Sequence, residues 1–356
     1  MKKIVLTGGG TAGHVTPNIA LLPALQAAGY EIAYVGSYEG IEKKLIADFN
    51  IPYTGISTGK FRRYLDPKNF SDPFRVMKGF VEARNYLKNY QPDVVFSKGG
   101  FVSVPVVRAA ASLHIPCIIH ESDMTPGLAN KLCIPVAEKV CCNFPETMKN
   151  IPADKAVLTG SPIRAELAQG SRLAGLNMCG FTANKPVIMV IGGSLGAANV
   201  NKAVRDALPK LLEDFQVVHL CGKDKIDNLL LNTPGYKQFE YIKAELKDIF
   251  AMADVVISRA GANAICELLA LKKPNILIPL PAASSRGDQL LNAASFEAQG
   301  YSIVLNEDDI TTNLLVDKVH FNRQNYVEAM SRSHQMDAIN TIMLLINEAA
   351  NKSHTQ

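Results

Sequence analysis

The sequence predicts an α/β protein built from two Rossmann-like, doubly wound parallel-sheet domains that face a cleft. Short apolar runs rich in β-branched residues recur along the 356 residues, and most lack the polar alternation of half-exposed strands. Segments with helical spacing separate these runs, which is typical of parallel sheets covered by helices on both faces. A strand that leads into a glycine-rich turn and then a helix occurs twice, at residues 3–28 and 187–212.

These runs and segments give the order of the expected elements. Strands are expected at Ile4 to Leu6, Ile32 to Val35, Val94 to Phe96, Cys117 to Ile119, Val187 to Ile191, Val217 to Leu220, Val255 to Ile257 and Ile276 to Ile278. Helices are expected at Asn18 to Ala28, Asp72 to Asn89, Ala198 to Leu212, Asn263 to Leu271 and Gln289 to Gln299. Because the pattern restarts and its periodicity weakens near Gly160 to Gly180, the expected domains are residues 1–163 and 164–337.

Composition narrows the class of protein. Apolar residues make up 47% and charged residues 20%, which excludes disorder, collagen and a coiled coil. The net charge of +4 is small for the length, so no nucleic-acid partner is expected. The seven cysteines form no C-x-x-C pair, which predicts buried, reduced thiols and neither a disulfide framework nor a zinc site. No apolar run approaches the ~18 residues of a membrane span or forms a secretory signal, so a soluble protein on the cytoplasmic side is expected.

The segment from Lys60 to Phe80 combines six basic residues with two acidic and five aromatic ones. Asp72 and Pro73 suit the start of a helix, and Phe74 and Met77 follow at helical spacing. Basic side chains beside aromatic ones suit contact with an anionic phospholipid surface, and the alternative is a solvated helix whose aromatic residues belong to the core. The expected membrane patch consists of Phe61, Arg62, Arg63, Tyr64, Lys68, Phe74 and Lys78.

Gly8 to His14 forms a glycine-rich turn between an expected strand and an expected helix. Its backbone amides and the helix N-terminus suit a phosphate or another polar ligand. The turn also fits the G-x-G-x-x-G fingerprint of nicotinamide dinucleotides, but the acid expected about 20 residues later would be Glu31, which precedes the second strand. His14 at a helix N-terminus is expected to be neutral near pH 7 and able to accept a proton, and a purely structural histidine is the alternative.

Gly192 to Ala197 forms the second glycine-rich turn, whose amides and serine hydroxyl suit a phosphate. Ser258 to Asn263 ends another strand and opens a helix whose N-terminus would meet the same anion. Glu267 in that helix either accepts hydrogen bonds from a ribose diol or is an exposed helix residue. Asp288 and Gln289 begin a later helix, either as a simple N-cap or as contacts to a sugar.

Seven motifs occur in an order that resembles the MurG family of glycosyltransferases, from about residue 3 to residue 300. They are Gly8 to Pro17, Ser97 to Pro105, His120 to Lys131, Gly160 to Arg164, Gly192 to Asn201, Ser258 to Glu267 and Gly287 to Asn292. Each motif alone is modestly specific, whereas seven in order are highly specific. The resemblance implies the GT-B fold and transfer of N-acetylglucosamine (GlcNAc) from UDP-GlcNAc to the MurNAc 4-hydroxyl of undecaprenyl-pyrophosphoryl-MurNAc-pentapeptide (lipid I), which gives lipid II for peptidoglycan synthesis.

The resemblance also implies roles for individual residues. Contacts to the acceptor and its diphosphate are expected at Gly9, Gly10, Thr11, Gly13, His14, Gly99 and Gly100. Contacts to UDP-GlcNAc are expected at Thr11, Ala12, Gly13, Asn130, Arg164, Gly193, Ser194, Leu195, Gly196, Asn199, Asn263, Ala264, Glu267 and Gln289. The last helix, about residues 338–356, is expected to pack back onto the first domain, as in related folds.

The chain departs from the family pattern at two positions. Many relatives carry a hydroxyl residue where this chain has Ala264, so one donor-phosphate contact is left to the backbone. Many relatives have two glutamines where this chain has Asp288 and Gln289, so the GlcNAc contact falls on Gln289.

The implied reaction inverts the sugar, so the acceptor hydroxyl attacks the donor C1 in line as UDP leaves. His14 is the leading candidate for the base, and Glu121 is the alternative base or an orienting partner. Two helix N-termini and Arg164 would stabilise the charge that develops on UDP. The sequence contains no D-x-D pair that would hold a metal on the diphosphate, so no cofactor is expected and a metal is not obligatory.

The resemblance implies a peripheral protein on the cytoplasmic face of the cell membrane, where it would meet UDP-GlcNAc, lipid I and an anionic phospholipid surface. Contact with other proteins of cell-wall synthesis and division is a further expectation about partners. Two rival functions use the same donor. One is a UDP-GlcNAc 2-epimerase, and the other is a non-catalytic UDP-sugar-binding protein, which would have no use for His14 beside Glu121.

Overall fold

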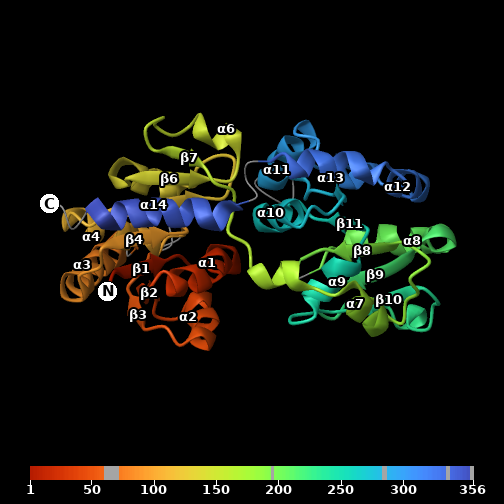
Figure 1. Ribbon diagram of the computed structural model, residues 1–356, viewed down its shortest axis with the longest axis horizontal. Helices are drawn as coiled ribbons and strands as arrows, with labels where there is room; N and C mark the ends of the chain where they lie inside the picture. Colours follow the sequence, from red (N-terminus) through yellow and green to blue (C-terminus); the bar gives the residue numbers. More distant parts are fainter. Residues whose placement is uncertain (60–71, 194–195, 283–286, 334–336, 353–356) are drawn as a thin grey trace. The chain divides into compact units, whose positions relative to one another are not determined.

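The computed structural model describes residues 1–59, 72–193, 196–282, 287–333 and 337–352 (Figure 1). The chain divides into two compact units. Unit 1 comprises Met1–Arg164 and Asp337–Gln356, and unit 2 comprises Ala165–Met336. Each unit has a parallel sheet and an apolar core of its own.

Within the described residues, unit 1 contains a seven-stranded sheet in the order β3-β2-β1-β4-β5-β6-β7, with every neighbouring pair parallel. The strands are β1 (Lys3–Thr7), β2 (Glu31–Ser37), β3 (Tyr53–Ile56), β4 (Val94–Ser97), β5 (Cys117–Glu121), β6 (Lys139–Cys142) and β7 (Ala156–Leu158). The strand order reverses between β1 and β4. Both strands are buried almost throughout because helices cover both faces, which explains their unbroken apolar runs.

Two apolar clusters hold the helices of unit 1 on opposite faces of the sheet. One cluster joins the sheet to α3, α4 and α5, and the other joins it to α1, α2 and α14. α14 contacts α1, β4 and β5, so the end of the described chain packs within unit 1. The helical elements are η1 (Ala12–His14), α1 (Thr16–Ala27), α2 (Ile41–Ile46), η2 (Ala47–Phe49), α3 (Asp72–Tyr90), α4 (Ser103–Ser112), α5 (Leu128–Cys133), η4 (Ile134–Val136), α6 (Pro145–Met148) and α14 (Ala338–Lys352).

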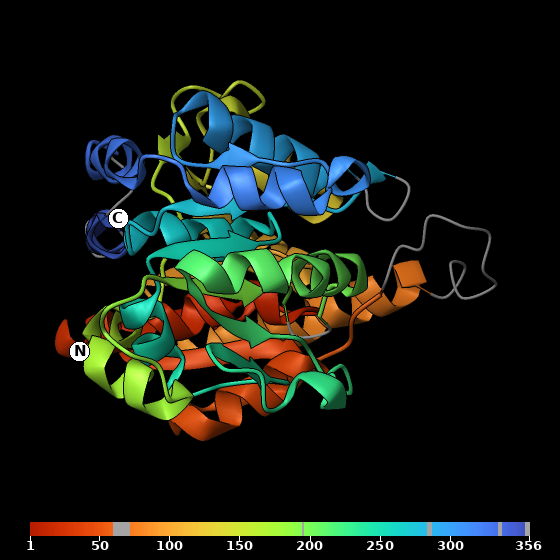
Figure 2. The same cartoon turned by 90° about the vertical axis from the view of Figure 1, so that its right-hand side faces the viewer.

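Unit 2 repeats this architecture with a six-stranded parallel sheet among its described residues, in the order β10-β9-β8-β11-β12-β13 (Figure 2). The strands are β8 (Val187–Ile191), β9 (Gln216–Leu220), β10 (Tyr236–Phe239), β11 (Val255–Ser258), β12 (Asn275–Leu277) and β13 (Ile303–Val304). α8 packs beside α12, and α7 packs beside α9. The helical elements are η5 (Ala165–Gln169), α7 (Arg172–Cys179), α8 (Ala198–Asp214), η6 (Asn228–Leu230), α9 (Leu246–Met252), α10 (Ala262–Ala270), α11 (Asp288–Ala298), η8 (Glu307–Asp309), α12 (Thr312–Val319) and α13 (Arg323–Ser331).

The prediction of two doubly wound parallel sheets is confirmed. In both sheets the chain starts at a central strand, β1 or β8, and winds outward in two directions. All seven cysteines are free and buried, as predicted. Among the described residues, no helix is both long enough and apolar enough to cross a membrane.

Candidate active site

Unit 1 brings two glycine turns together at the carboxyl edge of its sheet, where the strand order reverses. The amide of Gly9, after β1, donates to the carbonyl of Gly99, after β4, at 3.3 Å. A Cβ on Gly100 would lie 2.2 Å from the Gly9 carbonyl oxygen, and one on Gly8 would lie 2.5 Å from the His14 carbonyl oxygen. Only glycine therefore permits this approach. Open α/β sheets bind ligands at this position.

His14 lies in the first glycine turn with its ring anchored through one nitrogen. Nδ1 lies 3.1 Å from the Gly9 carbonyl oxygen and 3.0 Å from the Thr11 hydroxyl. Burial, together with the charge of Lys98, lowers the pKa of His14 to about 4, so the ring is neutral at pH 7. When Nδ1 donates its proton to the carbonyl, Nε2 carries a lone pair. No group in the described part of the chain hydrogen-bonds Nε2.

Glu42, which the sequence did not single out, lies beneath the first glycine turn. Its fully buried carboxylate accepts hydrogen bonds from the Gly10 amide at 3.1 Å, the Ser37 amide at 2.9 Å and the Ser37 hydroxyl at 2.5 Å. Burial raises the pKa of this carboxyl, but the hydrogen bonds together outweigh burial and lower the pKa below its ordinary value. Glu42 is therefore a charged brace that fixes the turn.

The amides of Gly9 and Gly10, which were predicted to contact the acceptor and its diphosphate, are engaged within unit 1. The Gly9 amide is bonded to a carbonyl and the Gly10 amide to the Glu42 carboxylate, so neither N–H is available to an anion in this conformation. The amides of Thr11 and Ala12 have no hydrogen-bond partner within the described residues. Thr11 and Ala12 are both among the predicted contacts, and their unpaired amides suit an anion.

Glu121, at the end of β5, organises the loop that follows it. One carboxylate oxygen accepts from the Asp123 amide at 2.9 Å, and the other accepts from the Gly127 amide at 3.0 Å and from Asn130 Nδ2 at 2.8 Å. Asn130 Nδ2 also donates to the carbonyl of His120 at 3.1 Å. Because both oxygens of Glu121 are engaged, the geometry favours an orienting role over that of a base.

A buried lysine, Lys98, follows β4 directly and is 1% exposed. Its ammonium donates to His120 Nδ1 at 2.8 Å and to the Ser122 hydroxyl. His120 Nε2 donates to the Gly160 carbonyl at 2.9 Å. Burial and the charge of Lys98 hold the pKa of His120 well below its usual value, so His120 is the neutral acceptor. In the sequence, Lys98 belongs to the motif Ser97 to Pro105, and no role was predicted for it.

Two buried polar atoms at predicted site residues lack a hydrogen bond within the described part of the chain. They are Asn130 Oδ1 in unit 1 and Arg164 Nε, at the last residue of the first segment of unit 1. Buried polar atoms are nearly always paired in folded proteins. A ligand hydroxyl would donate to Asn130 Oδ1, and a ligand phosphate oxygen would accept from Arg164 Nε.

The second glycine turn follows β8, beside the point where the strand order of unit 2 reverses. Gly193 has a φ of 84° and Gly196 a φ of 67°, the left-handed region that favours glycine. A Cβ on Gly196 would lie 1.9 Å from the Cys221 carbonyl oxygen, so the position is closed to larger residues. The predicted contacts Ser194 and Leu195 lie outside the described residues.

α8 opens at this turn, and a polar network braces its first residues. Within the described residues no side chain caps the helix, so its first amides point toward the turn. Asn199 Nδ2 donates to Glu307 Oε1 at 2.5 Å, and the other carboxylate oxygen of Glu307 forms a largely buried ion pair with Arg259. Arg259 also donates to the Ile278 carbonyl at 3.0 Å. Asn199 is thus tied to Glu307, and neither Glu307 nor Arg259 was predicted.

The next predicted contacts lie on α10, which follows β11. Asn263 and Ala264 are in its first turn, and Glu267 follows in the second. All three side chains are half-buried. β11 neighbours β8 in the sheet, so the N-terminus of α10 opens at the same edge as the second glycine turn.

α11 places the remaining predicted contact, Gln289. Its side-chain oxygen accepts from the Leu280 amide at 3.1 Å, and among the described residues its Nε2 has no hydrogen-bond partner. Gly287 is the N-cap and Asp288 is the first helical residue, so Asp288 is not the N-cap. The Gln289 oxygen is therefore held in place, and its amide group is the part of the side chain that is open to a further contact.

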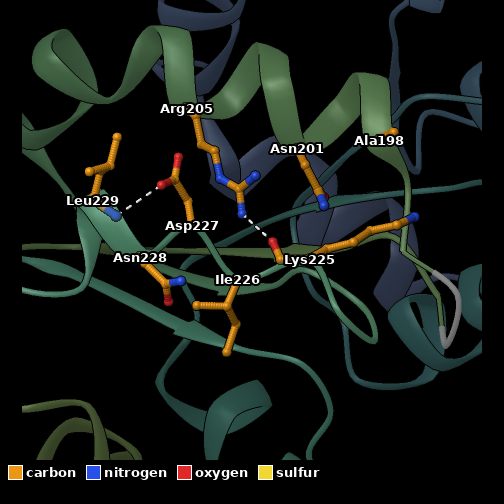
Figure 3. A pocket seen from close by; sticks show the side chains of 8 residues that line it. All are labelled: Ala198, Asn201, Arg205, Lys225, Ile226, Asp227, Asn228 and Leu229. Carbon is orange, nitrogen blue, oxygen red and sulfur yellow. Dashed lines mark hydrogen bonds between the residues drawn. The ribbon is translucent and has the colours of Figure 1, made fainter.

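A pocket of about 490 Å³ adjoins the first turns of α8 (Figure 3). It lies between Ala198, Asn201 and Arg205 on the helix and the loop after β9. Arg205 donates to the Lys225 carbonyl at 2.6 Å, and the Lys225 ammonium donates to the Gly196 carbonyl at 3.3 Å. The pocket therefore touches the second glycine turn through Lys225.

The predicted membrane patch is described only in part. Phe61, Arg62, Arg63, Tyr64 and Lys68 lie outside the described residues. On α3, Phe74 and Met77 are 79% and 64% exposed, and Val81 is exposed beside them, whereas Phe80 packs against the core of unit 1. Lys78 is exposed and lies 3.7 Å from Glu82. The described part of the segment thus presents an apolar stripe to solvent, and one aromatic residue belongs to the core.

No cluster of three or more His, Cys, Asp or Glu side chains that could hold a metal occurs in the described ranges of the chain.

Comparisons with known proteins match nearly the whole chain. Residues 4–142 match the glycosyltransferase family 28 N-terminal domain, and residues 187–345 match the C-terminal domain of that family. Proteins from Lachnospira eligens and Lachnoclostridium phytofermentans are each 64% identical over 98% of this chain and 99% of their own, and both are named UDP-N-acetylglucosamine–N-acetylmuramyl-(pentapeptide) pyrophosphoryl-undecaprenol N-acetylglucosamine transferase. The crystal structure of Acinetobacter baumannii MurG is 28% identical, covers 98% of this chain and 100% of its own, and superposes with a TM-score of 0.78.

Proposed function

The chain belongs to glycosyltransferase family 28, and from this premise we propose that it transfers GlcNAc from UDP-GlcNAc to undecaprenyl-pyrophosphoryl-MurNAc-pentapeptide. The observation that carries the proposal is the 64% identity, over nearly the full length, to transferases named for this reaction. The GT-B pair of parallel-sheet units supports it. An epimerase would share the fold, but the relatives that are 64% identical to this chain are named as transferases.

We infer that the carboxyl edge of unit 2 binds UDP-GlcNAc. The uncapped start of α8, the left-handed Gly193 and Gly196 and the N-terminus of α10 together suit a diphosphate. Glu267 would accept from the ribose diol, and the Nε2 of Gln289 would donate to a GlcNAc hydroxyl. Asn199 would act through Glu307, as a brace for the turn, and not by touching the donor.

We infer that the carboxyl edge of unit 1 takes the acceptor and supplies the base. The neutral Nε2 of His14 removes the proton of the MurNAc 4-hydroxyl as that oxygen bonds to the donor C1. The bond from C1 to the diphosphate oxygen breaks in the same step, and UDP leaves with the electron pair. A single displacement of this kind inverts the sugar. Glu121 orients the loop that carries Asn130, and the amides of Thr11 and Ala12 face the acceptor's diphosphate.

Charge stabilisation on UDP needs no metal in this proposal, because helix N-termini and the Arg164 guanidinium would supply it. The exposed stripe on α3 would touch the bilayer that holds the lipid acceptor, as a peripheral contact on the cytoplasmic face. Contact with other cell-wall and division proteins would add to this attachment.

The test is a transfer assay with labelled UDP-GlcNAc and a short-chain lipid-linked muramyl-pentapeptide acceptor, with EDTA present. A β-1,4-linked product under these conditions is the expected outcome. An epimer or free sugar formed from UDP-GlcNAc alone would favour the isomerase, and donor binding without turnover would favour a UDP-sugar-binding protein. Product that appears only when a metal is added back would overturn the metal-independent mechanism.

A further inference from the structure

Unit 2 has a second pocket, at the amino edge of its sheet, which is the edge away from both phosphate-binding helix starts. The pocket measures about 560 Å³ and is lined by the residues that lead into β8, β11 and β12 together with part of α13. Five basic side chains and one acidic side chain line it: Arg172, Lys185, Lys272, Lys273, Arg323 and Asp254. A cavity of this size is typical of small-molecule sites, and its charge is strongly positive.

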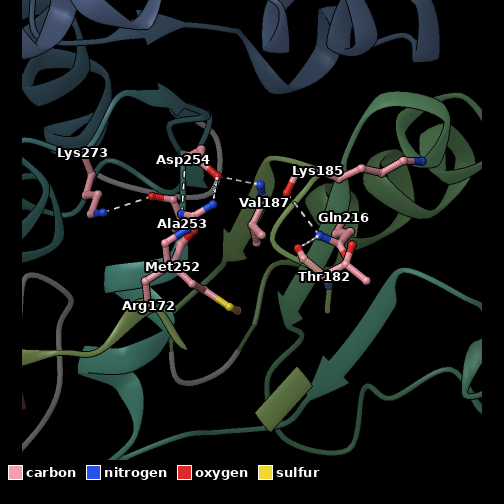
Figure 4. A network of polar contacts seen from close by, with 9 residues as sticks. All are labelled: Arg172, Thr182, Lys185, Val187, Gln216, Met252, Ala253, Asp254 and Lys273. Atoms are coloured by element: carbon pink, nitrogen blue, oxygen red, sulfur yellow. Dashed lines mark hydrogen bonds and ion pairs between the residues drawn. The ribbon is translucent and has the colours of Figure 1, made fainter. Parts of the chain in front are cut away.

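Hydrogen bonds hold three of the polar side chains that line the pocket, Arg172, Asp254 and Lys273 (Figure 4). Asp254 accepts from Arg172 at 3.2 Å and from the Val187 amide at 2.8 Å. Arg172 also donates to the Met252 carbonyl at 2.6 Å, and Lys273 donates to the Ala253 carbonyl at 3.0 Å. The one acidic side chain is therefore already used to position an arginine.

No acidic side chain among the described residues of unit 2 pairs with the other basic side chains of the pocket. Lys185 donates only to backbone carbonyls, those of Leu212 and Glu213 at the end of α8. Lys272 is exposed and Arg323 half-buried, and the side chain of neither has a hydrogen bond or ion pair with any described residue. Burial lowers the pKa of Lys273, as expected for an ammonium held without a full counter-charge.

Lys272 has a left-handed backbone conformation that is unusual for a long side chain. α10 ends in a Schellman motif, in which the Lys272 amide donates to the Leu269 carbonyl at 3.0 Å and the Lys273 amide to the Leu268 carbonyl at 2.9 Å. The residue at the left-handed position of this motif is usually glycine. Here it is Lys272, with a φ of 51°, so the sequence places a long cation at the pocket where a small residue would be favoured.

We propose that this pocket binds a phosphate-bearing ligand with at least two negative charges. The planar guanidinium group of Arg323 matches phosphate oxygens, and the lysine ammonium groups supply further donors. The Arg172 guanidinium is already paired with Asp254 and adds a donor at the edge of the site. The volume of about 560 Å³ fits a phosphate-bearing small molecule, and the basic side chains around it favour an anion. Two sources share this chemistry: a free polyphosphate or nucleotide, and the headgroup of an anionic phospholipid. The inference is independent of the transferase activity proposed above.

The test uses calorimetric titration of the full chain with inorganic tripolyphosphate while saturating UDP-GlcNAc occupies the donor edge. The variant is Lys272→Gly with Arg323→Gln, because glycine suits the backbone at the first position and glutamine keeps most of the bulk at the second. The control is Lys210→Gln with Lys318→Gln, which makes the same change in net charge on helix positions outside the pocket, one exposed and one half-buried like the pair that it matches. A second arm measures co-sedimentation with vesicles of about 30% anionic phospholipid, which reproduce the negative surface potential of a cytoplasmic leaflet.

We expect the wild type and the control to bind tripolyphosphate, and the pocket variant to bind it at least tenfold more weakly with transfer activity unchanged. Loss of vesicle binding alone in the pocket variant would also support the proposal and would assign the ligand to the lipid. If the pocket variant matches the control in both arms, the proposal is overturned. Melting temperatures of the variants separate a loss of ligand from a loss of fold.

Discussion

The neutral state of His14 gives the sharpest test of the proposed mechanism. The pKa of His14 is lowered from 6.5 to about 4, so protonation of the ring costs ~3 kcal/mol more in the folded protein than in water. At pH 7 roughly 0.1% of the folded molecules carry the proton, against about a quarter for an ordinary histidine. Lowering the pH from 7.5 to 5.5 should therefore leave kcat/KM nearly constant.

The acid limb of the pH–rate profile should have its midpoint near pH 4, where Nε2 gains a proton and cannot act as a base. His14→Ala should lower kcat by about 10²–10⁴-fold and remove this limb. The measurement is the transfer assay between pH 4 and 8. Far-UV circular dichroism should monitor the fold at each pH, because the chain has no tryptophan for fluorescence.

The matched control is His114→Gln, which removes an exposed histidine of the same unit and should leave the profile unchanged. A limb with its midpoint near 6.5 in the wild type would refute the burial argument. A kcat for His14→Ala within a few-fold of the wild type would refute the assignment of the base.

The same titration makes a statement about stability. Between pH 6.5 and 4 the unfolded chain binds a proton at His14 and the folded chain does not, so the free energy of unfolding falls as the pH falls. The contribution of His14 to this loss should be about 3 kcal/mol over that interval. Urea unfolding of the wild type and His14→Ala at both pH values isolates it, because other buried histidines contribute equally to both proteins. Equal pH dependence in the two proteins would contradict the shift.

Three further changes test the brace, the donor turn and the membrane contact. Glu42→Gln replaces one of the two acceptor oxygens beneath the first glycine turn with an NH2 group, so one buried donor loses its partner. We expect the free energy of unfolding to fall by about 1–3 kcal/mol, measured by urea unfolding, and kcat to fall as well. Gly196→Ala forces a Cβ to within 1.9 Å of the Cys221 carbonyl oxygen and should weaken UDP binding at least tenfold by calorimetry. Phe74→Ser with Met77→Ser should reduce co-sedimentation with anionic vesicles and leave the rate on a detergent-dispersed acceptor unchanged.

Each of these has an outcome that contradicts it. Full stability of Glu42→Gln would mean that the carboxylate does not hold the turn. Unchanged UDP affinity in Gly196→Ala would remove the second glycine turn from the donor site, and unchanged vesicle binding would remove α3 from the membrane contact. Leu173→Ser, which alters an exposed apolar residue of unit 2, is the control for the vesicle experiment.

The central strands were predictable because burial on both faces leaves them an unbroken apolar run, as in β1 and β8. The edge strands β3 and β10 were missed because their sequences mix polar and apolar residues. The strands β6, β7 and β13 were also missed, because they have only four, three and two residues and give too short an apolar run. α4 was missed for the opposite reason. Its sequence is rich in valine and alanine and contains a proline, so its helical period is hidden by near-complete burial.

The candidate site also has parts that the sequence predicts and parts that it does not. Glycine turns can be read from sequence because each is a local device of a few residues. Glu42 and Glu307 could not be found in this way. Glu42 lies 32 residues after its partner Gly10, and Glu307 lies 108 residues after its partner Asn199. In sequence, each resembles an ordinary acidic residue in the first turn of a helix. Only the sheet order brings these elements to the same edge.

His14 shows how a correct expectation can rest on a different physical cause. From the sequence, the helix N-terminus is expected to keep the ring neutral, whereas in the structure burial is the largest cause of the lowered pKa and the charge of Lys98 the next. Glu42 opposes Lys98 by raising the pKa, so two buried charges of opposite sign flank the turn and partly cancel at the ring. Neutrality of His14 therefore depends on how deeply the ring is packed. A ligand that closes the turn further would strengthen it, whereas an opening of the turn to water would raise the pKa toward 6.5.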